Sequence, residues 1–199
     1  MGSPSRRPTR RGFLAGAVIG VPAGIAGTAV LTRGGRRILL TEPLPPTPER
    51  IRLGSVTYSP TRVLDGVKSL SYAANMLASR IARERGFDEA LLVTPHGRVL
   101  EAPTSSIFWV SDGSVLTPPL SDHILASITR ALVIEVSGAS EQACTLEDLA
   151  AADEAFLAST TREVQPVAAI DELTFAEGSL TAGIAKELAA RIRSELGGG

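Results

Sequence analysis

One lysine, placed between a predicted strand and a predicted helix, constrains this chain more than any other feature of its sequence. Among its 20 lysines and arginines, only Lys68 and Lys186 are lysines. Only an amine whose pKa is lowered by burial or neighbouring charges forms a Schiff base, whereas a guanidinium stays protonated. Lys68 is therefore a candidate for covalent chemistry, and the alternative is a surface lysine without a chemical role. Lys186 is predicted to lie on a solvated helix face.

The residues on either side of Lys68 predict the rim of a sheet. Residues 51–58 alternate and are β-prone, which predicts a strand. Apolar residues then recur at helical spacing from Leu70 to Ala82, and Gly86 occupies a C-cap position. Lys68 thus lies at a strand-to-helix connection, where functional side chains are common.

Seven sequence blocks stand out around and beyond Lys68. They are KSLSYAAN (68–75), GFDEALL (86–92), GRVLEA (97–102), TSSIFW (104–109), TPPL (117–120), ILASITR (124–130) and STTREVQPV (159–167). Together they resemble the class IV pyridoxal-phosphate aminotransferases, a family that includes branched-chain aminotransferases, D-amino acid aminotransferases and 4-amino-4-deoxychorismate lyases. The similarity follows the family's order from about Thr32 to the C-terminal helix, and several spaced motifs are more specific than one.

The resemblance implies the fold-type IV architecture, an α+β fold in which β-hairpins and short helices form an open, barrel-like sheet. Turn signals at 95–97 and 112–113 predict two hairpins, which favours α+β over a doubly wound parallel sheet. The sequence further predicts helices over 128–136, 146–151 and 180–196, and strands over 154–158 and 163–170.

The chain is predicted to have three parts. Residues 1–31 form a basic and hydrophobic leader or an accidental N-terminus, 32–50 a remnant of a small-domain strand with a Pro-rich linker, and 51–199 the cofactor-binding large domain. The resemblance implies that most of the family's small N-terminal domain is missing. In relatives that domain supplies an arginine to the cofactor phosphate and closes over the substrate.

The leader has three interpretations. Arg10-Arg11 precedes an uncharged run from residue 12 to 32, which is the pattern of a twin-arginine export signal. The same run is long enough for one membrane-spanning helix, and the third interpretation is an accidental start. The predicted compartment is the cytoplasm, where amino-acid pools lie, with export or tethering as the alternative. Membrane contact is expected only through residues 13–31.

Charge and composition exclude several classes of function. Residues 1–37 hold seven arginines and no acid, so the rest of the chain has 13 lysines and arginines against 21 aspartates and glutamates. Such an acidic body argues against a nucleic-acid surface. One cysteine, Cys144, excludes an internal disulfide. With only His96 and His123 beside it, no metal site is expected, and both histidines are predicted to lie in loops.

Two residues near Lys68 are candidates to contact the cofactor ring. The resemblance gives Glu101 the role of pairing with the pyridine nitrogen, which keeps that nitrogen protonated. The alternative is a solvated glutamate at a strand end. Tyr72 lies one helical turn past Lys68. It either faces the cofactor or is a core residue whose hydroxyl reaches solvent.

A predicted helix start supplies the candidate phosphate site. Ser127, Ile128 and Thr129 open this helix, and its free N–H groups and dipole favour an anion. The structural alternative is a capped helix without a ligand. The resemblance adds Thr160 as a second contact to the phosphate, although paired threonines in a turn are weak evidence by themselves.

The resemblance implies a transaminase that uses pyridoxal 5'-phosphate to move an amino group between an amino acid, branched-chain amino acids included, and a 2-oxo acid. Lys68 would hold the cofactor and then move a proton. Thr160, Thr161 and Arg36 are the candidate substrate contacts, and the alternative for Arg36 is an arginine of the basic N-terminal run without a ligand. One alternative is a 4-amino-4-deoxychorismate lyase that releases pyruvate and 4-aminobenzoate. A second is a truncated, weakly active or non-catalytic cofactor-binding remnant. The family also implies a homodimer.

Overall fold

The computed structural model describes residues 25–31, 34–43, 46, 48–61, 63, 66–68 and 71–197. The chain divides into two compact units. The smaller unit comprises residues 1–47 with 198–199, and the larger comprises residues 48–197.

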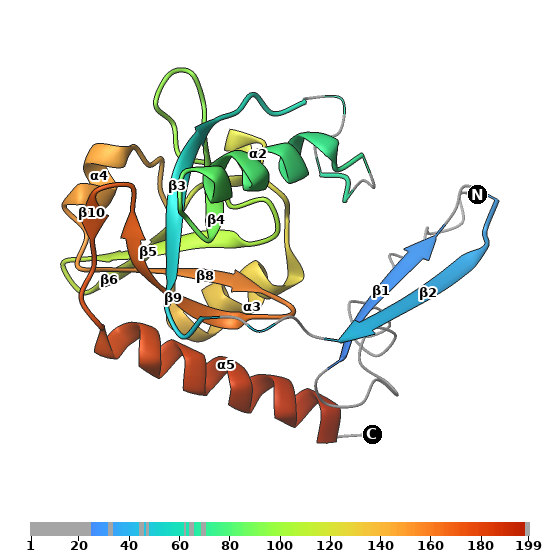
Figure 1. Cartoon of the computed structure of the whole chain (residues 1–199). Helices are drawn as coiled ribbons and strands as arrows, with labels where there is room; N and C mark the ends of the chain where they lie inside the picture. The colour runs from blue at the N-terminus through green and yellow to red at the C-terminus, as the bar shows by residue number, and fades with distance from the viewer. Residues whose placement is uncertain are drawn as a thin grey trace, which may run out of the picture. The chain divides into compact units, whose positions relative to one another are not determined.

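A mixed sheet of eight strands forms the centre of the larger unit and curls into a half-barrel (Figure 1). Its order is β4-β3-β9-β8-β5-β6-β7, with β10 beside β9. The strands are β3 (Ile51–Thr57), β4 (Glu89–Val93), β5 (Ser106–Ser111), β6 (Ser114–Thr117), β7 (Ser140–Glu141), β8 (Glu154–Ser159), β9 (Glu163–Ile170) and β10 (Leu173–Thr174). The pairs β3–β4, β3–β9 and β6–β7 are parallel, and the other pairs are antiparallel. The predicted α+β fold is confirmed.

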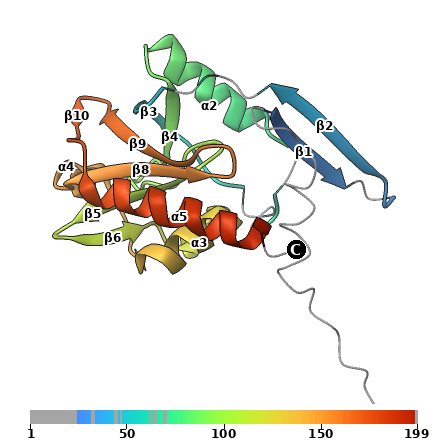
Figure 2. The same ribbon diagram turned by 90° about the horizontal axis from the view of Figure 1, so that it is seen from below.

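Helices cover the sheet on both faces. They are α2 (Ala73–Glu84), the 3-10 helix η2 (Leu120–Asp122), α3 (Ile128–Ser137), α4 (Leu146–Ala150) and α5 (Ser179–Gly197). Figure 2 shows α5 running along β8 with α3 beside it. Val133 of α3 and Leu188 of α5 are fully buried in one cluster with Phe108 and Phe156. Leu149 of α4 lies in a second cluster.

Alternation along β5 and β8 explains why these two strands occupy the middle of the sheet. On β5, Ile107 and Trp109 belong to one apolar cluster and Phe108 belongs to the other. Phe108 and Phe156 are directly opposite across the two strands and stack with ring centroids 5.0 Å apart. Burial of both faces stabilises the sheet by roughly 25 cal/mol for each Å² of apolar surface removed from water.

Most elements predicted from the sequence are found near their predicted bounds, with two differences. The helix after Lys68 begins only at Ala73, so Lys68 lies in the connection between β3 and α2, and Leu70 lies outside the described residues. In the hairpin that turns at 95–97, the return arm makes only isolated bridges, such as Val93 with Val99. The arm stays hydrogen-bonded to β4, because the Leu100 N–H donates to the Leu92 carbonyl oxygen and the Leu92 N–H donates to the Glu101 carbonyl oxygen, each at 2.9 Å.

The smaller unit contains a hairpin in which β1 (Ile25–Leu31) pairs antiparallel with β2 (Arg37–Pro43). Leu39 and Leu40 of β2 are exposed. Thus β1 lies inside the stretch predicted as a leader, and β2 lies inside the predicted 32–50 segment; these domain boundaries stay a prediction. Arg10-Arg11 lies outside the described residues. Within the described part of the chain, every helix is too short or too polar to cross a membrane.

Candidate active site

A cavity of about 400 Å³ in the larger unit gathers most of the predicted site residues. Its lining includes Lys68, Tyr72, Glu101, Ser127 and Thr160, which come from four separate stretches of the chain. The volume lies within the range of roughly 300–1,000 Å³ that is usual for small-molecule sites.

Lys68 reaches this cavity from the connection between β3 and α2. Its side chain is exposed, and its neighbour Val67 also lines the cavity. Lys186 lies on α5 with an exposed side chain, so the predicted solvated helix face is confirmed. The two lysines therefore differ in surroundings, since one lines a cavity and the other faces solvent along a helix.

Glu101 presents a largely buried carboxylate to the same cavity. The backbone N–H of Leu125 donates to both carboxylate oxygens, each at 3.3 Å. Burial raises the pKa of Glu101 to about 7, although the Leu125 hydrogen bond and the positive charges of Lys68 and Arg130 act to lower it. A carboxylate with this pKa gains from a cationic partner inside the cavity, because such a partner would offset the cost of its burial.

Tyr72 belongs to a chain of hydrogen bonds along one wall. Its hydroxyl donates to the carbonyl oxygen of Pro103 at 2.5 Å, and Asn75 Nδ2 donates to the same oxygen at 3.1 Å. The Tyr58 hydroxyl donates in turn to Asn75 Oδ1 at 3.2 Å. Burial, followed by the negative charge of Glu101, raises the pKa of Tyr72, so the phenol keeps its proton and remains a donor.

The start of α3 forms another wall. Ser127 is its N-cap, as predicted, and its Oγ accepts from the backbone N–H of Arg130 at 3.3 Å. Thr129 is buried, and its hydroxyl lies 3.4 Å from that of Thr160 in the β8–β9 turn. The helix start and the turn are therefore in contact. Ile128 is 42% exposed, and neither Ile128 nor Thr129 is among the residues that line the cavity.

Two further predicted residues are not in the cavity lining. Thr161 follows Thr160 in the β8–β9 turn with an exposed side chain. Arg36 belongs to the smaller unit, in the turn before β2, and is also exposed. Their substrate contacts stay predictions from the sequence.

Most residues of the cavity lining were not predicted from the sequence as site residues, and Ser105, Ser106 and His123 are three of these. The hydroxyls of Ser105 and Ser106 are buried and have no hydrogen-bond partner among the described residues. A buried hydroxyl without a partner costs free energy, which a ligand or water would relieve. His123 also lines the cavity, from a left-handed backbone position with φ 64°. It lies in a loop, as predicted.

These groups fit a phosphorylated aldehyde cofactor. The cavity combines an amine, a buried carboxylate of raised pKa, the N-terminus of a ten-residue helix, and hydroxyl donors. An amine can bond an aldehyde, a helix start binds a phosphate, and a carboxylate pairs with a protonated ring nitrogen.

Comparison with known proteins points in the same direction. The family model of amino-transferase class IV matches residues 11–170. A putative branched-chain-amino-acid aminotransferase of Methanocaldococcus jannaschii is 38% identical over 139 residues, which is 65% of this chain and 48% of that protein. The branched-chain-amino-acid aminotransferase of Escherichia coli is 31% identical over 113 residues, which is 54% of this chain and 37% of that protein.

Solved structures share the fold. A branched-chain aminotransferase from Thermoproteus uzoniensis, crystallised with norvaline, superposes with a TM-score of 0.72 and 31% identity, and the match covers 82% of this chain and 59% of that one. A putative 4-amino-4-deoxychorismate lyase from Legionella pneumophila gives a TM-score of 0.70 at 24% identity and covers 80% and 61%, which supports the fold alone. The chain thus spans about half the length, or less, of the curated relatives it matches.

Proposed function

The chain belongs to the class IV aminotransferases, and we propose that it binds pyridoxal 5'-phosphate in the described cavity and transfers an amino group between an amino acid and a 2-oxo acid. The observation that carries this proposal is the convergence of Lys68 and Glu101 on one cavity, beside the N-terminus of α3. When bound, the cofactor supplies an aldehyde that carries the amino group and a ring that accepts electrons from the substrate Cα.

Each residue then has a task of its own. Lys68 holds the cofactor through its amine and, once released by the substrate, accepts and returns a proton at Nζ. Glu101, oriented by the Leu125 N–H, places a negative charge where the ring nitrogen binds. Tyr72 keeps its phenolic proton and borders the ring. The α3 N-terminus at Ser127 and the Thr160 hydroxyl bind the phosphate.

Branched-chain amino acids are the first substrates to test, because the curated relatives described above carry that activity in their names. The assay follows transfer of the amino group from leucine, isoleucine or valine to a 2-oxo acid. Release of pyruvate from 4-amino-4-deoxychorismate without transamination would instead favour the lyase.

Covalent trapping tests the proposal without relying on turnover. Protein incubated with pyridoxal 5'-phosphate is reduced with borohydride, digested and mapped by mass spectrometry. The chain has only two lysines, so the label is expected on Lys68 and not on Lys186. The Lys68→Arg variant, which keeps the charge but loses the reactive amine, serves as the control and should remain unlabelled. A label confined to Lys186 in the unmodified sequence would refute the assignment.

We also infer a homodimer in the cytoplasm. The family resemblance implies the dimer, and α2 exposes large apolar side chains that a second copy would cover, among them Met76 at 68% and Leu77 at 57%. Sedimentation equilibrium of the purified chain should give the mass of two copies. The compartment rests on the amino-acid pools that the reaction needs, and cell fractionation should recover the protein with cytoplasmic markers.

A further inference from the structure

A largely buried ion pair lies behind the cavity and joins two of its walls. The Arg162 guanidinium donates to the Glu89 carboxylate, and the exposed fractions of the two side chains are 17% and 4%. Burial of two charges is costly, and such a pair persists only where further hydrogen bonds satisfy the remaining donors and acceptors. The groups that satisfy them show what the pair holds in place.

On one side, Glu89 fixes the wall that carries Tyr72. Glu89 Oε1 accepts a hydrogen bond from the Thr104 hydroxyl at 3.2 Å. Thr104 lines the cavity directly after Pro103, whose carbonyl oxygen accepts from Tyr72 and Asn75. A negative charge at the start of β4 is thereby linked to the loop that borders the cavity.

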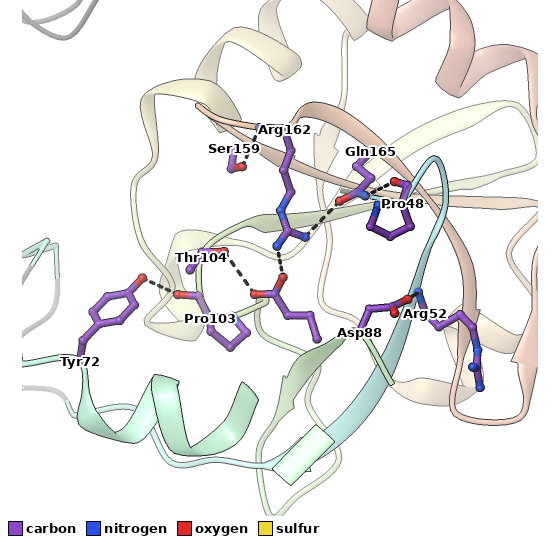
Figure 3. A network of polar contacts seen from close by, with 10 residues as sticks. Pro48, Arg52, Tyr72, Asp88, Pro103, Thr104, Ser159, Arg162 and Gln165 are labelled. Carbon is purple, nitrogen blue, oxygen red and sulfur yellow. Dashed lines mark hydrogen bonds and ion pairs between the residues drawn. The ribbon is translucent and has the colours of Figure 1, made fainter. Parts of the chain in front are cut away.

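On the other side, Arg162 fixes the β8–β9 turn (Figure 3). Its guanidinium donates to Gln165 Oε1 at 3.1 Å, and its backbone N–H donates to Ser159 Oγ at 3.4 Å. Gln165 Nε2 donates in turn to the carbonyl oxygen of Pro48 at 2.7 Å. Ser159 and Thr160, which line the cavity, therefore lie in a turn that hydrogen bonds hold at both ends.

We propose that Glu89 and Arg162 are positioning residues that hold the Thr160 hydroxyl at the start of α3 and so determine how tightly the cavity binds a phosphate group. Neither residue lines the cavity, and they act through Thr104 and the β8–β9 turn. This inference rests on the proposed function, in which Thr160 contacts the cofactor phosphate. A guanidinium is needed because its planar fork serves Glu89 and Gln165 at once, which an ammonium group does not reproduce.

A purely structural role would weaken the whole fold and every ligand alike, so the test compares two ligands that differ only in the phosphate. The probes are pyridoxal 5'-phosphate and pyridoxal, titrated by absorbance against the full chain. In Arg162→Gln, affinity for pyridoxal 5'-phosphate is expected to fall about ten- to a hundredfold, the effect of losing one charge-assisted contact to an anion. Affinity for pyridoxal should change less than about threefold. Arg162→Lys should fall between the parent and Arg162→Gln.

Two controls separate positioning from stability. Arg85→Gln removes a more exposed ion pair, with Asp171, among residues that do not line the cavity, and it should leave the preference for the phosphorylated ligand unchanged. The double variant Glu89→Leu with Arg162→Met replaces the pair by apolar side chains, an exchange that often preserves stability. It should fold and still lose the preference.

The possible results distinguish a failure of this inference from a failure of the proposed function. An equal loss of affinity for both ligands in Arg162→Gln, or a double variant that keeps the parent's preference, would overturn the inference and leave the proposed function standing. A parent chain that binds pyridoxal and pyridoxal 5'-phosphate equally would overturn both, because the phosphate contact itself would then be absent.

Discussion

The two sides of the cavity are built in different ways. Lys68 is presented by the connection between β3 and α2, where the described side chains of Val63 and Val67 are also exposed. By contrast, Glu101 receives two hydrogen bonds from a backbone N–H, and Thr160 contacts the start of α3. The position of Lys68 therefore depends on the path of an exposed segment. The positions of Glu101 and Thr160 depend on hydrogen bonds at the ends of strands and of a helix.

This difference predicts which substitutions affect turnover alone and which also affect the free energy of unfolding. A side chain that is exposed and makes few packing contacts is expected to matter for the reaction alone. A side chain that is buried and hydrogen-bonded affects the free energy of unfolding as well as the reaction. Substitutions on the Lys68 side should therefore change turnover without changing stability, and substitutions on the Glu101 side should change both.

The largest effect is expected at Lys68. Lys68→Ala removes the amine that holds the cofactor and moves the proton, and loss of a positioned acid–base group lowers turnover by about 10²- to 10⁴-fold. The free energy of unfolding of the cofactor-free protein, measured by urea titration, should change by less than about 0.5 kcal/mol, as for other exposed sites. Lys186→Ala, on the solvated face of α5, is the matched control and should alter neither. A clear drop in the free energy of unfolding of Lys68→Ala would contradict the expectation that the Lys68 side contributes to the reaction alone.

A smaller loss of turnover is expected at Glu101. Glu101→Gln keeps size and the acceptor for the Leu125 N–H, but it removes the charge opposite the ring nitrogen. Removal of one preorganised electrostatic contact commonly lowers kcat by about 10²- to 10³-fold. The cofactor should still be retained, as shown by its absorbance after gel filtration. Unchanged turnover would assign Glu101 a structural role.

The same variant gives a prediction for pH. The Glu101 carboxyl has a pKa of about 7 in the folded chain against 4.5 in the unfolded one, so the folded state holds the proton that the unfolded state releases. The stability that this proton provides is fully present below pH 4.5 and is lost as pH rises to about 7, by about 3 kcal/mol in total. Cofactor-free Glu101→Gln lacks this loss, so it should be more stable than the parent at pH 8 and equal to it at pH 4.5. Parallel stability curves from pH 4.5 to 8 would contradict the raised pKa.

The sequence predicted the parts of the site that depend on local pattern. Ser127 as a helix N-cap and the hairpin at 112–113 follow from neighbouring residues, and the structure confirms both. The Glu89–Arg162 pair could not be predicted in this way, because it depends on strand order. The parallel pairing of β3 with both β4 and β9 brings residues from two distant stretches together. In the sequence, the two residues stand in separate blocks, Glu89 in GFDEALL (86–92) and Arg162 in STTREVQPV (159–167), with nothing in either block to pair them.

The smallest effect is expected at Ser127, where cap and phosphate site coincide. Ser127→Ala removes the side-chain acceptor for the Arg130 N–H and should lower the free energy of unfolding by about 1 kcal/mol. Thr145→Ala, at the cap of α4 and not among the cavity residues, should lower stability by a similar amount, with affinity for pyridoxal 5'-phosphate unchanged.

Ser127→Asp separates the two tasks of this helix start. Aspartate is as good an N-cap as serine, and its charge favours the positive end of the helix dipole, so stability should be kept or slightly raised. The same charge would lie beside the bound phosphate and repel it, so affinity for pyridoxal 5'-phosphate should fall while affinity for pyridoxal holds. Titration of both ligands against Ser127→Asp measures this directly. Unchanged affinity for the phosphorylated ligand would mean that α3 begins away from the phosphate and that Ser127 serves the fold alone.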